Sequence, residues 1–207
     1  MGTNPEIQAK VHREIDDVLG EEDRPVTYED LGRLKYLEAC IKETLRLYPS
    51  VPLIARQVVD DVNISKFMLL TRKVINLEGS VLPAGTGIVM IASMVHRDPR
   101  YWTDPEVFRP ERFIDGEIKH AYAYIPFSAG SRNCIGTYSV KPWVEKYQIS
   151  GQRFAIMEEK VVLSSILRRL RVESKLRTDQ MRVAAELIIR PMHGNHIRFH
   201  RRQFGEY

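Results

Sequence analysis

The feature that most constrains this chain is a single cysteine in a glycine-rich stretch, with an arginine close by. Residues 127–136 read FSAGSRNCIG, so Cys134 lies between Gly130 and Gly136. Glycines let a backbone turn tightly and approach a flat ligand, and the N–H groups freed by such a turn can stabilise a thiolate. We therefore expect a loop that presents Cys134 as a metal-binding thiolate. The alternative is an inert buried thiol, which is the commoner state of a lone cysteine.

The surroundings of Cys134 limit the kind of metal site. A structural zinc site needs four protein ligands, and no second cysteine or histidine lies at the usual zinc spacing from Cys134. A haem iron needs fewer protein ligands, because the porphyrin fills four positions on the iron and a cysteine thiolate can supply the axial ligand. Arg132 could then pair with a haem propionate, since guanidinium and carboxylate match in geometry.

Composition and charge exclude several classes of protein. The chain has 207 residues, of which 43% are hydrophobic, which is enough for a real core in one domain or two small ones. Its 31 basic and 27 acidic residues give a net charge of +4, too small and too scattered to indicate nucleic-acid binding. Two cysteines predict no disulfide framework and a reducing compartment. No apolar run has membrane-spanning length and no signal peptide is evident, so we expect a soluble or peripheral chain without a membrane anchor.

Hydrophobic periodicity predicts helices and strands in a definite order. Amphipathic spacing predicts helices over 5–19, 35–47 and 152–170, with a short helix near Leu31. The last helix should bury one apolar side, formed by Phe154, Met157, Val161, Val162, Ser165 and Leu167. Strands are expected at 57–64 and 80–91 within a small sheet over 51–91, with a turn at 83–87, and a terminal hairpin over 185–200. The basic residues 200–202 are interpreted as a solvated end.

Four further residues have both a functional and a simpler interpretation. Glu43 and Arg46 are three residues apart on one helix face, where the default is a surface ion pair worth a few tenths of a kcal/mol. Arg56 ends the apolar extended segment 51–56 and could equally be a solvated strand-end arginine. His96, in a turn-rich stretch, is expected to be a hydrogen-bonding structural residue, because no partner ligand lies near it in the sequence.

The spacing Phe-x-x-Gly-x-Arg-x-Cys-x-Gly in 127–136 resembles the cysteine-ligand signature of the cytochrome P-450 family, the haem-thiolate monooxygenases. The resemblance extends from Pro5 to about His200 in the family's order of elements, and residues 36–49 look most like family four, whose members hydroxylate fatty acids and related lipids. It implies a mainly α fold with small β-sheets, an incomplete C-terminal portion of the P-450 fold. The whole chain, 1–207, would be one partial domain with a meander at 96–126 and the cysteine loop at 127–136.

The resemblance also implies roles for individual residues. Cys134 would be the axial thiolate of the haem iron, and no other catalytic residue is expected in this chain. Residues that would contact the haem are Phe127, Gly130, Arg132, Ile135, Gly136 and Arg56. Glu43, Arg46 and Arg112 would form a buried structural triad that holds the cysteine loop.

The implied function is that of the haem-binding C-terminal part of a monooxygenase, which inserts one oxygen atom from O2 into a lipid-like substrate such as a fatty acid. Electrons would come from NADPH through cytochrome P-450 reductase, with cytochrome b5 as a second donor. The reductase would dock on the cysteine side near Lys160 and Arg168. The full-length family implies the cytoplasmic face of the endoplasmic reticulum membrane. The alternatives are a catalytically inactive haem-binding fragment and a non-functional splice or gene-model product that lacks the oxygen-activating helix.

Two stretches depart from the family pattern. Residues 66–78 interrupt the expected hairpin, and residues 137–151 separate Gly136 from the helix that begins at Gln152. Both look like retained introns or mis-joined exons. The second matters more, because a thiolate gains from a helix dipole only when the helix begins directly after the cysteine loop.

Overall fold

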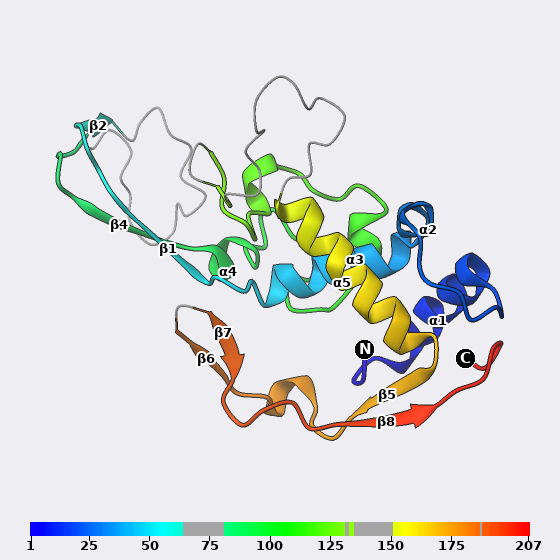
Figure 1. Cartoon of the computed structure of the whole chain (residues 1–207). Coiled ribbons are helices and arrows are strands. Elements are labelled where there is room, and N and C mark those ends of the chain that lie inside the picture. Colours follow the sequence, from blue (N-terminus) through cyan, green and yellow to red (C-terminus); the bar gives the residue numbers. More distant parts are fainter. Residues whose placement is uncertain (64–80, 131–132, 135–150, 187) are drawn as a thin grey trace.

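Three helices pack together at the centre, and short two-stranded sheets lie around them (Figure 1). The computed structural model describes residues 1–63, 81–130, 133–134, 151–186 and 188–207. The central helices are α1 (Pro5–Leu19), α3 (Lys35–Leu47) and α5 (Gly151–Leu167). The stretches 66–78 and 137–150 lie outside the described residues.

Local sequence explains where the first helices begin and end. Pro5 occupies the first turn of α1, and Gly20 ends the helix with a φ of 67°. Helix α2 (Tyr28–Arg33) begins with a capping box between Thr27 and Asp30. Helix α3 has no side-chain cap of its own, but its first N–H groups donate to Glu14 of α1 at 2.6 and 2.8 Å. The carboxylate of Glu14 therefore fixes the start of α3 against α1.

The hydrophobic core lies where these helices meet. Most of its residues come from α1 and α3, which bury their apolar stripes against each other. The buried members are Val11, Ile15, Val18, Leu19, Leu31, Leu34, Leu37, Cys40, Ile41, Leu45, Ile156 and Leu167. Helix α5 contributes the last two and so covers the core from the other side.

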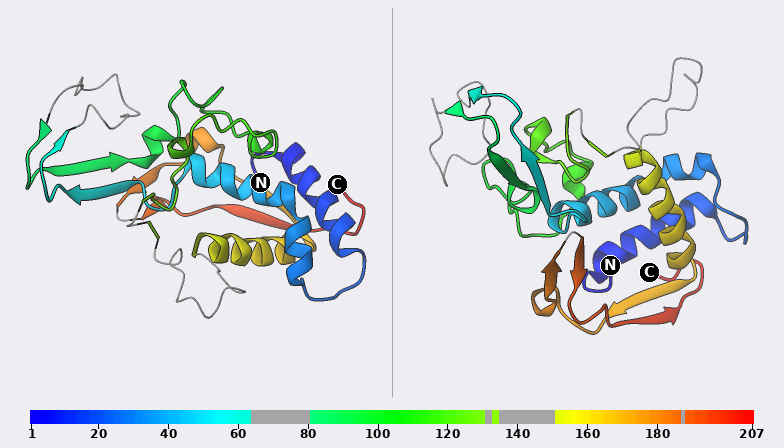
Figure 2. Two further views of the ribbon diagram at one scale, coloured as in Figure 1. Left: turned by 90° about the horizontal axis from the view of Figure 1, so that it is seen from above. Right: turned by 60° about the vertical axis from the view of Figure 1, so that its left-hand side comes forward.

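The predicted small sheet consists of two antiparallel pairs. Strand β1 (Leu53–Gln57) pairs with β4 (Gly87–Ile91), and β2 (Val62–Asn63) pairs with β3 (Val81–Leu82). The β1–β4 ribbon extends away from the helices in every view (Figure 2). The turn predicted at 83–87 is confirmed around Gly85, which has a φ of 85° and lies between β3 and β4. The strand predicted over 57–64 is interrupted between Gln57 and Val62.

A meander of short elements follows β4 and lies on α3. It begins with α4 (Ala92–Val95) and contains the 3-10 turns η2 (Pro110–Phe113) and η3 (Ala121–Ala123). Of these, η2 packs most closely on α3. The meander therefore runs past the Glu43–Arg46 segment before it reaches the cysteine loop.

The predicted terminal hairpin is wrong. Strand β8 (Ile197–Arg201) pairs with β5 (Leu170–Ser174), and β7 (Ile189–Pro191) pairs with β6 (Val183–Ala185), with η5 (Thr178–Gln180) between β5 and β6. Ala185 ends β6 and pairs with Ile189 at the start of β7, so these two residues lie on neighbouring strands. The helix predicted to reach residue 170 ends at Leu167, because Leu170 begins β5 and pairs with Arg201.

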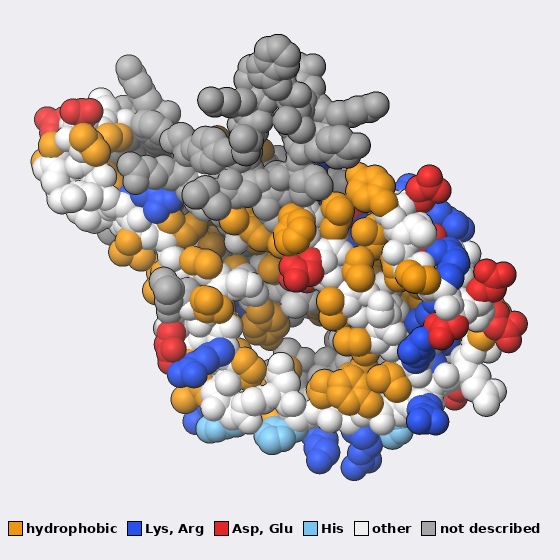
Figure 3. Space-filling view, viewed as in Figure 1, with side chains coloured by type: hydrophobic (Ala, Val, Ile, Leu, Met, Phe, Trp, Pro, Cys, Tyr) orange, Lys and Arg blue, Asp and Glu red, His pale blue; other side chains and the backbone are white. Residues whose placement is uncertain are grey.

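The apolar side predicted for α5 is only partly right, since Leu167 is buried and Met157 packs against the core as expected. The buried residues of α5 are Ile156, Lys160, Ser164 and Leu167, whereas Phe154, Val161 and Val162 are exposed. Figure 3 shows hydrophobic side chains gathered on the face over α5. The rest of the prediction failed because hydropathy ranks Lys160 and Ser164 as surface residues, although specific hydrogen bonds keep both inside.

Of the basic residues 200–202, expected to be a solvated end, Arg201 is exposed but Arg202 is buried. Arg202 is 8% exposed, and its guanidinium forms an ion pair with Asp16 of α1. Its Nε donates to the carbonyl oxygen of Leu167 at 3.0 Å. This contact fastens the end of β8 to α1 and α5. No helix formed by the described residues has both the length and the apolar character that a membrane crossing needs.

Candidate functional site

Cys134 lies at the end of a tight loop. Its N–H donates to the carbonyl oxygen of Phe127 at 3.0 Å, and the N–H of Asn133 donates to Gly130 at 3.2 Å. The backbone has positive φ at Gly130, 85°, and at Ser128, 65°. Gly130 is therefore required by the turn itself, because residues with a Cβ rarely adopt this conformation. Arg132, Ile135 and Gly136 lie outside the described residues.

The two cysteines have opposite environments. Cys40 is buried on α3, and burial raises the pKa of its thiol to about 12. Cys134 is exposed. The interpretation as an inert buried thiol therefore fits Cys40 and is wrong for Cys134.

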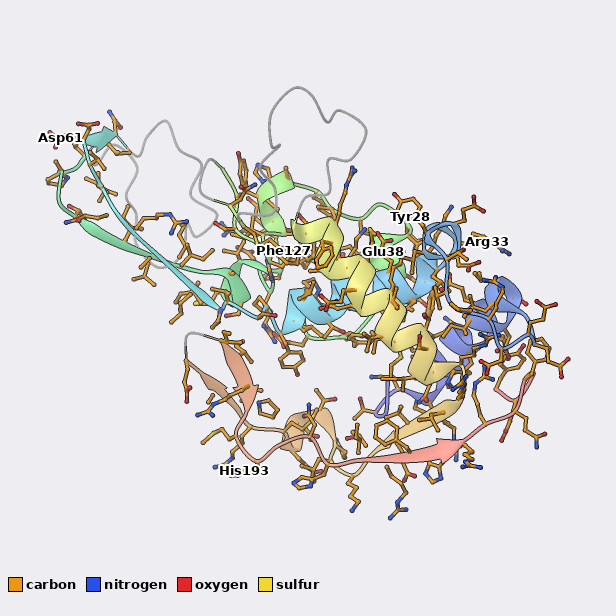
Figure 4. The ribbon with its side chains drawn as sticks, viewed as in Figure 1. Tyr28, Arg33, Glu38, Asp61, Phe127 and His193 are labelled. Atoms are coloured by element: carbon orange, nitrogen blue, oxygen red, sulfur yellow. The ribbon has the colours of Figure 1, made fainter. Side chains whose placement is uncertain are left out.

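Phe127 attaches the loop to the core. Its side chain is partly buried and packs against the core cluster that includes Ile156 and Leu45. Figure 4 shows Phe127 close to α5, far from His193 in the β6–β7 region. The loop thus has one apolar anchor beside α3 and α5 while its cysteine faces outward.

Glu43, Arg46 and Arg112 form a fully buried ion cluster beneath the meander. Arg46 makes two bonds to the carboxylate of Glu43, at 2.7 and 2.9 Å, and the Nε of Arg112 lies 3.1 Å from Glu43 Oε1. All three side chains are 0% exposed. The backbone N–H of Arg109 donates to the same carboxylate at 2.8 Å. The surface ion pair considered above is therefore excluded.

The remaining donors of the two arginines hold the meander. Arg46 donates to the carbonyl oxygens of His96 and Pro105 at 2.8 and 2.7 Å. Arg112 donates to Thr103 at 2.9 Å and to Asp104 at 3.3 Å. Buried guanidinium groups need such partners, since an unsatisfied buried charge is very costly. The cluster thus ties η2 and the preceding turns to α3.

Trp102 covers this cluster and was not predicted as part of it. The indole is 1% exposed, and the guanidinium carbons of Arg46 and Arg112 lie 5.1 and 5.8 Å from its ring centroid. Its Nε1 donates to Ala123 at 3.3 Å. The only sequence signal was an aromatic residue in a turn-rich segment otherwise full of charged residues.

The arginine predicted to contact a haem propionate, Arg56, and the residues predicted to dock a reductase, Lys160 and Arg168, differ in exposure and hydrogen bonding. Arg56 is half-buried on β1, and its Nη1 donates to the carbonyl oxygen of Ala55 at 2.8 Å. Its contact with a haem stays a prediction. Lys160 is 4% exposed and donates to Leu31 and Glu38, each at 2.6 Å, so it cannot serve as a surface charge for a reductase. Arg168 is half-buried and donates to the carbonyl oxygens of Arg24 and Gly20.

The described part of the loop suits a haem that binds through one thiolate. Cys134 is exposed, and a Cβ at Gly130 would meet no atom of the described residues within 4 Å. A flat ligand can therefore approach the turn without a steric barrier at this glycine. Phe127 provides an apolar, partly buried contact beside it.

An exposed cysteine on a glycine turn, braced by a buried Glu–Arg–Arg cluster, is the arrangement expected of a haem-thiolate protein. The sequence model described as Cytochrome P450 matches residues 1–138, which is two thirds of the chain. The chain belongs to the cytochrome P450 family, the haem-thiolate monooxygenases, whose cofactor is haem. Within that family it is most like family four.

Individual relatives agree with this assignment. The chain is 45% identical to human Cytochrome P450 4V2 over 208 residues, which is 100% of the chain and 34% of the relative. It is 46% identical to the mouse protein of that name, over 98% of the chain and 34% of the relative. It is 40% identical to Cytochrome P450 4c3 of Drosophila melanogaster, over 94% of the chain and 32% of the relative. The chain thus spans about a third of the length of these curated relatives.

Proposed function

We propose that this chain is the haem-binding, C-terminal portion of a monooxygenase of family four, with Cys134 as the axial thiolate. The observation that carries the proposal is the exposed Cys134 on a turn whose Gly130 has a φ of 85° and is open to a ligand. When bound, haem supplies activation of O2, so that one oxygen atom can enter the substrate. The side chains described here hold the ligand in place.

Each proposed residue has a distinct task. Cys134 would hold the haem iron as its axial thiolate, and the oxygen chemistry would be supplied by the haem when bound. Phe127 keeps one side of the loop apolar, and Gly130 gives the ligand room. Arg56 and Arg132 would neutralise the propionates of the haem by guanidinium–carboxylate pairing. Ile135 and Gly136 complete the loop in this proposal.

The Glu43–Arg46–Arg112 cluster has a structural role in the proposal. It fixes the meander that leads into the cysteine loop, and its two ion pairs share the Glu43 carboxylate out of contact with solvent. Because none of the three is exposed, none offers an acid or base to a substrate. The cluster therefore supports the loop without taking part in chemistry.

The proposed substrate and electron-transfer partners of the monooxygenase are those implied by membership in family four. Membership in family four favours a lipid-like substrate such as a fatty acid. Electrons would come from NADPH through cytochrome P-450 reductase, with cytochrome b5 as a second donor, and the site of action would be the cytoplasmic face of the endoplasmic reticulum membrane. Lys160 is not among the docking residues, because it is buried.

One observation favours a second function. The chain spans only about a third of the length of its relatives, which fits a haem-binding fragment without turnover of its own. Both functions use Cys134 as the ligand. They differ in whether bound O2 is used to oxidise a substrate.

Turnover separates the two functions. The purified chain, loaded with haem, would be incubated with NADPH, cytochrome P-450 reductase and a long-chain fatty acid, and hydroxylated product would be measured. If the wild-type chain forms hydroxylated fatty acid and the Cys134→Ala variant forms none, the monooxygenase function is supported. Haem binding through Cys134 without product supports the fragment, and haem binding that is unchanged in Cys134→Ala overturns both.

A further inference from the structure

His96 bridges the ion cluster and the cysteine loop. The residue is 0% exposed and directly follows α4. Its ring Nδ1 lies 3.0 Å from the carbonyl oxygen of Arg46, and its Nε2 lies 2.8 Å from the backbone nitrogen of Ile125. A single buried side chain therefore connects α3 to the segment that enters the loop.

These two contacts fix the protonation state of the ring. A carbonyl oxygen can only accept and a backbone N–H can only donate, so Nδ1 carries the proton and Nε2 accepts. The pKa of His96 is lowered to about 4, mainly by burial and also by the nearby charges of Arg46 and Arg97. The Tyr124 ring, 5.5 Å away, packs beside the imidazole. The neutral ring thus acts as a donor at one end and an acceptor at the other.

Ile125 is where this bridge meets the loop. Its carbonyl oxygen accepts the N–H of Ser128 at 3.1 Å, and Ser128 has the positive φ that begins the turn. Two residues after Ile125, Phe127 accepts the N–H of Cys134 at 3.0 Å. A displacement of Ile125 would therefore also displace Phe127 and the backbone of Cys134.

Other anchors hold residues that come earlier in the chain. Trp102 donates to the carbonyl oxygen of Ala123, and the hydroxyl of Tyr124 donates to that of Lys42 at 3.1 Å. Neither contacts Ile125 through the hydrogen bonds described here. The bond from Ile125 to His96 is the tie nearest the turn among these three.

We infer that His96 is a positioning residue for the axial cysteine: its Nε2 accepts the N–H of Ile125 and holds the entry of the Cys134 loop, while the contact of Nδ1 with the carbonyl oxygen of Arg46 orients the ring. The inference rests on the proposed function, because it assumes that Cys134 is the ligand. His96 itself touches neither the ligand sulfur nor a substrate in this account. Its effect on the thiolate passes through Ile125 and Phe127.

Three substitutions separate the two ends of the bridge. In His96→Gln the amide oxygen can reach the Nε2 position and accept from Ile125. In His96→Asn the shorter amide can donate to Arg46 but does not reach Ile125, and His96→Phe keeps the ring without either hydrogen bond. All three should destabilise the protein, so stability alone cannot test the inference.

The first readout is amide hydrogen exchange at Ile125 and Cys134 in the full chain without haem. Exchange at both amides should be about tenfold or more faster in His96→Asn and His96→Phe, and close to wild type in His96→Gln. Asp16→Asn is the matched control, because it disturbs a buried ion pair at Arg202, away from the loop. Unchanged exchange at Cys134 in the Asn and Phe variants overturns the inference.

The second readout is the absorption spectrum of the reduced, carbon-monoxide-treated protein after haem titration. The thiolate-type spectrum should persist in His96→Gln and in Asp16→Asn, and be lost or reduced in His96→Asn and His96→Phe. Equal spectra in all four variants overturn the inference while the proposed function stands. If wild type itself lacks a thiolate-type spectrum, the proposed function fails, and the exchange experiment still decides whether His96 holds the loop.

Discussion

At the scale of single residues, substitutions in the buried Glu43–Arg46–Arg112 cluster should have a large effect on stability. The Glu43 carboxylate pairs with both Arg46 and Arg112, so removing Glu43 or Arg46 leaves buried charge with less compensation. Glu43→Ala or Arg46→Ala should lower the free energy of unfolding by roughly 3–5 kcal/mol. Urea unfolding followed by circular dichroism measures the change.

The matched control is an ion pair at the surface. Glu186 and Arg190 pair at 2.7 Å with 56% and 68% of their side chains exposed. Glu186→Ala should change the free energy of unfolding by less than about 1 kcal/mol. Similar losses from Glu43→Ala and Glu186→Ala would contradict the structural role given to the cluster.

Two buried histidines should make the protein sensitive to acid. Burial lowers the pKa of His96 to about 4, helped by Arg46 and Arg97. Burial likewise lowers the pKa of His12 to about 4, helped by Arg202 and Arg171 and opposed by Asp16. Because an unfolded histidine has a pKa of about 6.5, the unfolded chain binds more protons between about pH 6.5 and pH 4. Stability is therefore full above this window and falls as the pH drops through it.

The slope of this loss can be measured. Each histidine should contribute up to about 1.4 kcal/mol per pH unit, and unfolding free energies at pH 6.5, 6 and 5.5 avoid most carboxylate titration. His96→Gln should reduce the slope, because its side chain does not titrate. A slope that is the same in this variant, or stability that rises as the pH falls, would contradict the assignment of a neutral His96.

The sequence predicted some of these residues and missed others for a physical reason. The glycine spacing predicted a tight turn at Cys134, and the resemblance to the family indicated the Glu43 cluster. The buried state of Lys160 was not predictable from periodicity, because it depends on Glu38 and Leu31, more than a hundred positions away in the chain. Long-range partners decide whether a charge can be buried.

At the scale of elements, the pairing of β8 with β5 depends on the arginine that follows it. Arg202 is tied to Asp16 on α1 and to the carbonyl oxygen of Leu167 at the end of α5. Arg202→Ala should lower the free energy of unfolding by about 3 kcal/mol, since it leaves Asp16 buried without its partner. Thermal and urea unfolding measure the loss.

The neighbouring arginine serves as the control. Arg201 is exposed and lies opposite Leu170 in the sheet. Arg201→Ala should cost no more than about 0.5 kcal/mol. If the two substitutions have equal effects, the tail is a solvated end as the sequence first suggested.

Elements with local signals were predictable and the sheet partners were not. Pro5, Gly20 and the apolar spacing between them predicted α1 to the residue. Strand partners follow from contacts between distant segments, so the local pattern of 185–200 gave the wrong hairpin. The end of the last helix was missed because Leu170 continues the apolar pattern but belongs to β5.

At the scale of the whole molecule, we predict that the stretch after the cysteine loop, 137–151, is the main departure from the family. The family match ends at residue 138, just beyond Gly136. Deleting 137–151 would join Gly136 to Gln152 and bring the helix N-terminus next to Cys134, where its dipole stabilises a thiolate. Haem should bind the shortened chain more tightly. Equal affinity of the two chains in a haem titration would show that this stretch does not weaken the site.

The central claim is that Cys134 is the axial thiolate of a haem-binding P450 chain. The most direct measurement is the absorption spectrum of the haem-loaded, reduced and carbon-monoxide-treated protein, compared among wild type, Cys134→Ala and Cys40→Ala. Wild type and Cys40→Ala should show the thiolate-type spectrum, because Cys40 is buried on α3 with a raised pKa. Cys134→Ala should show none. A thiolate-type spectrum that survives in Cys134→Ala, or is absent from wild type, would contradict the claim.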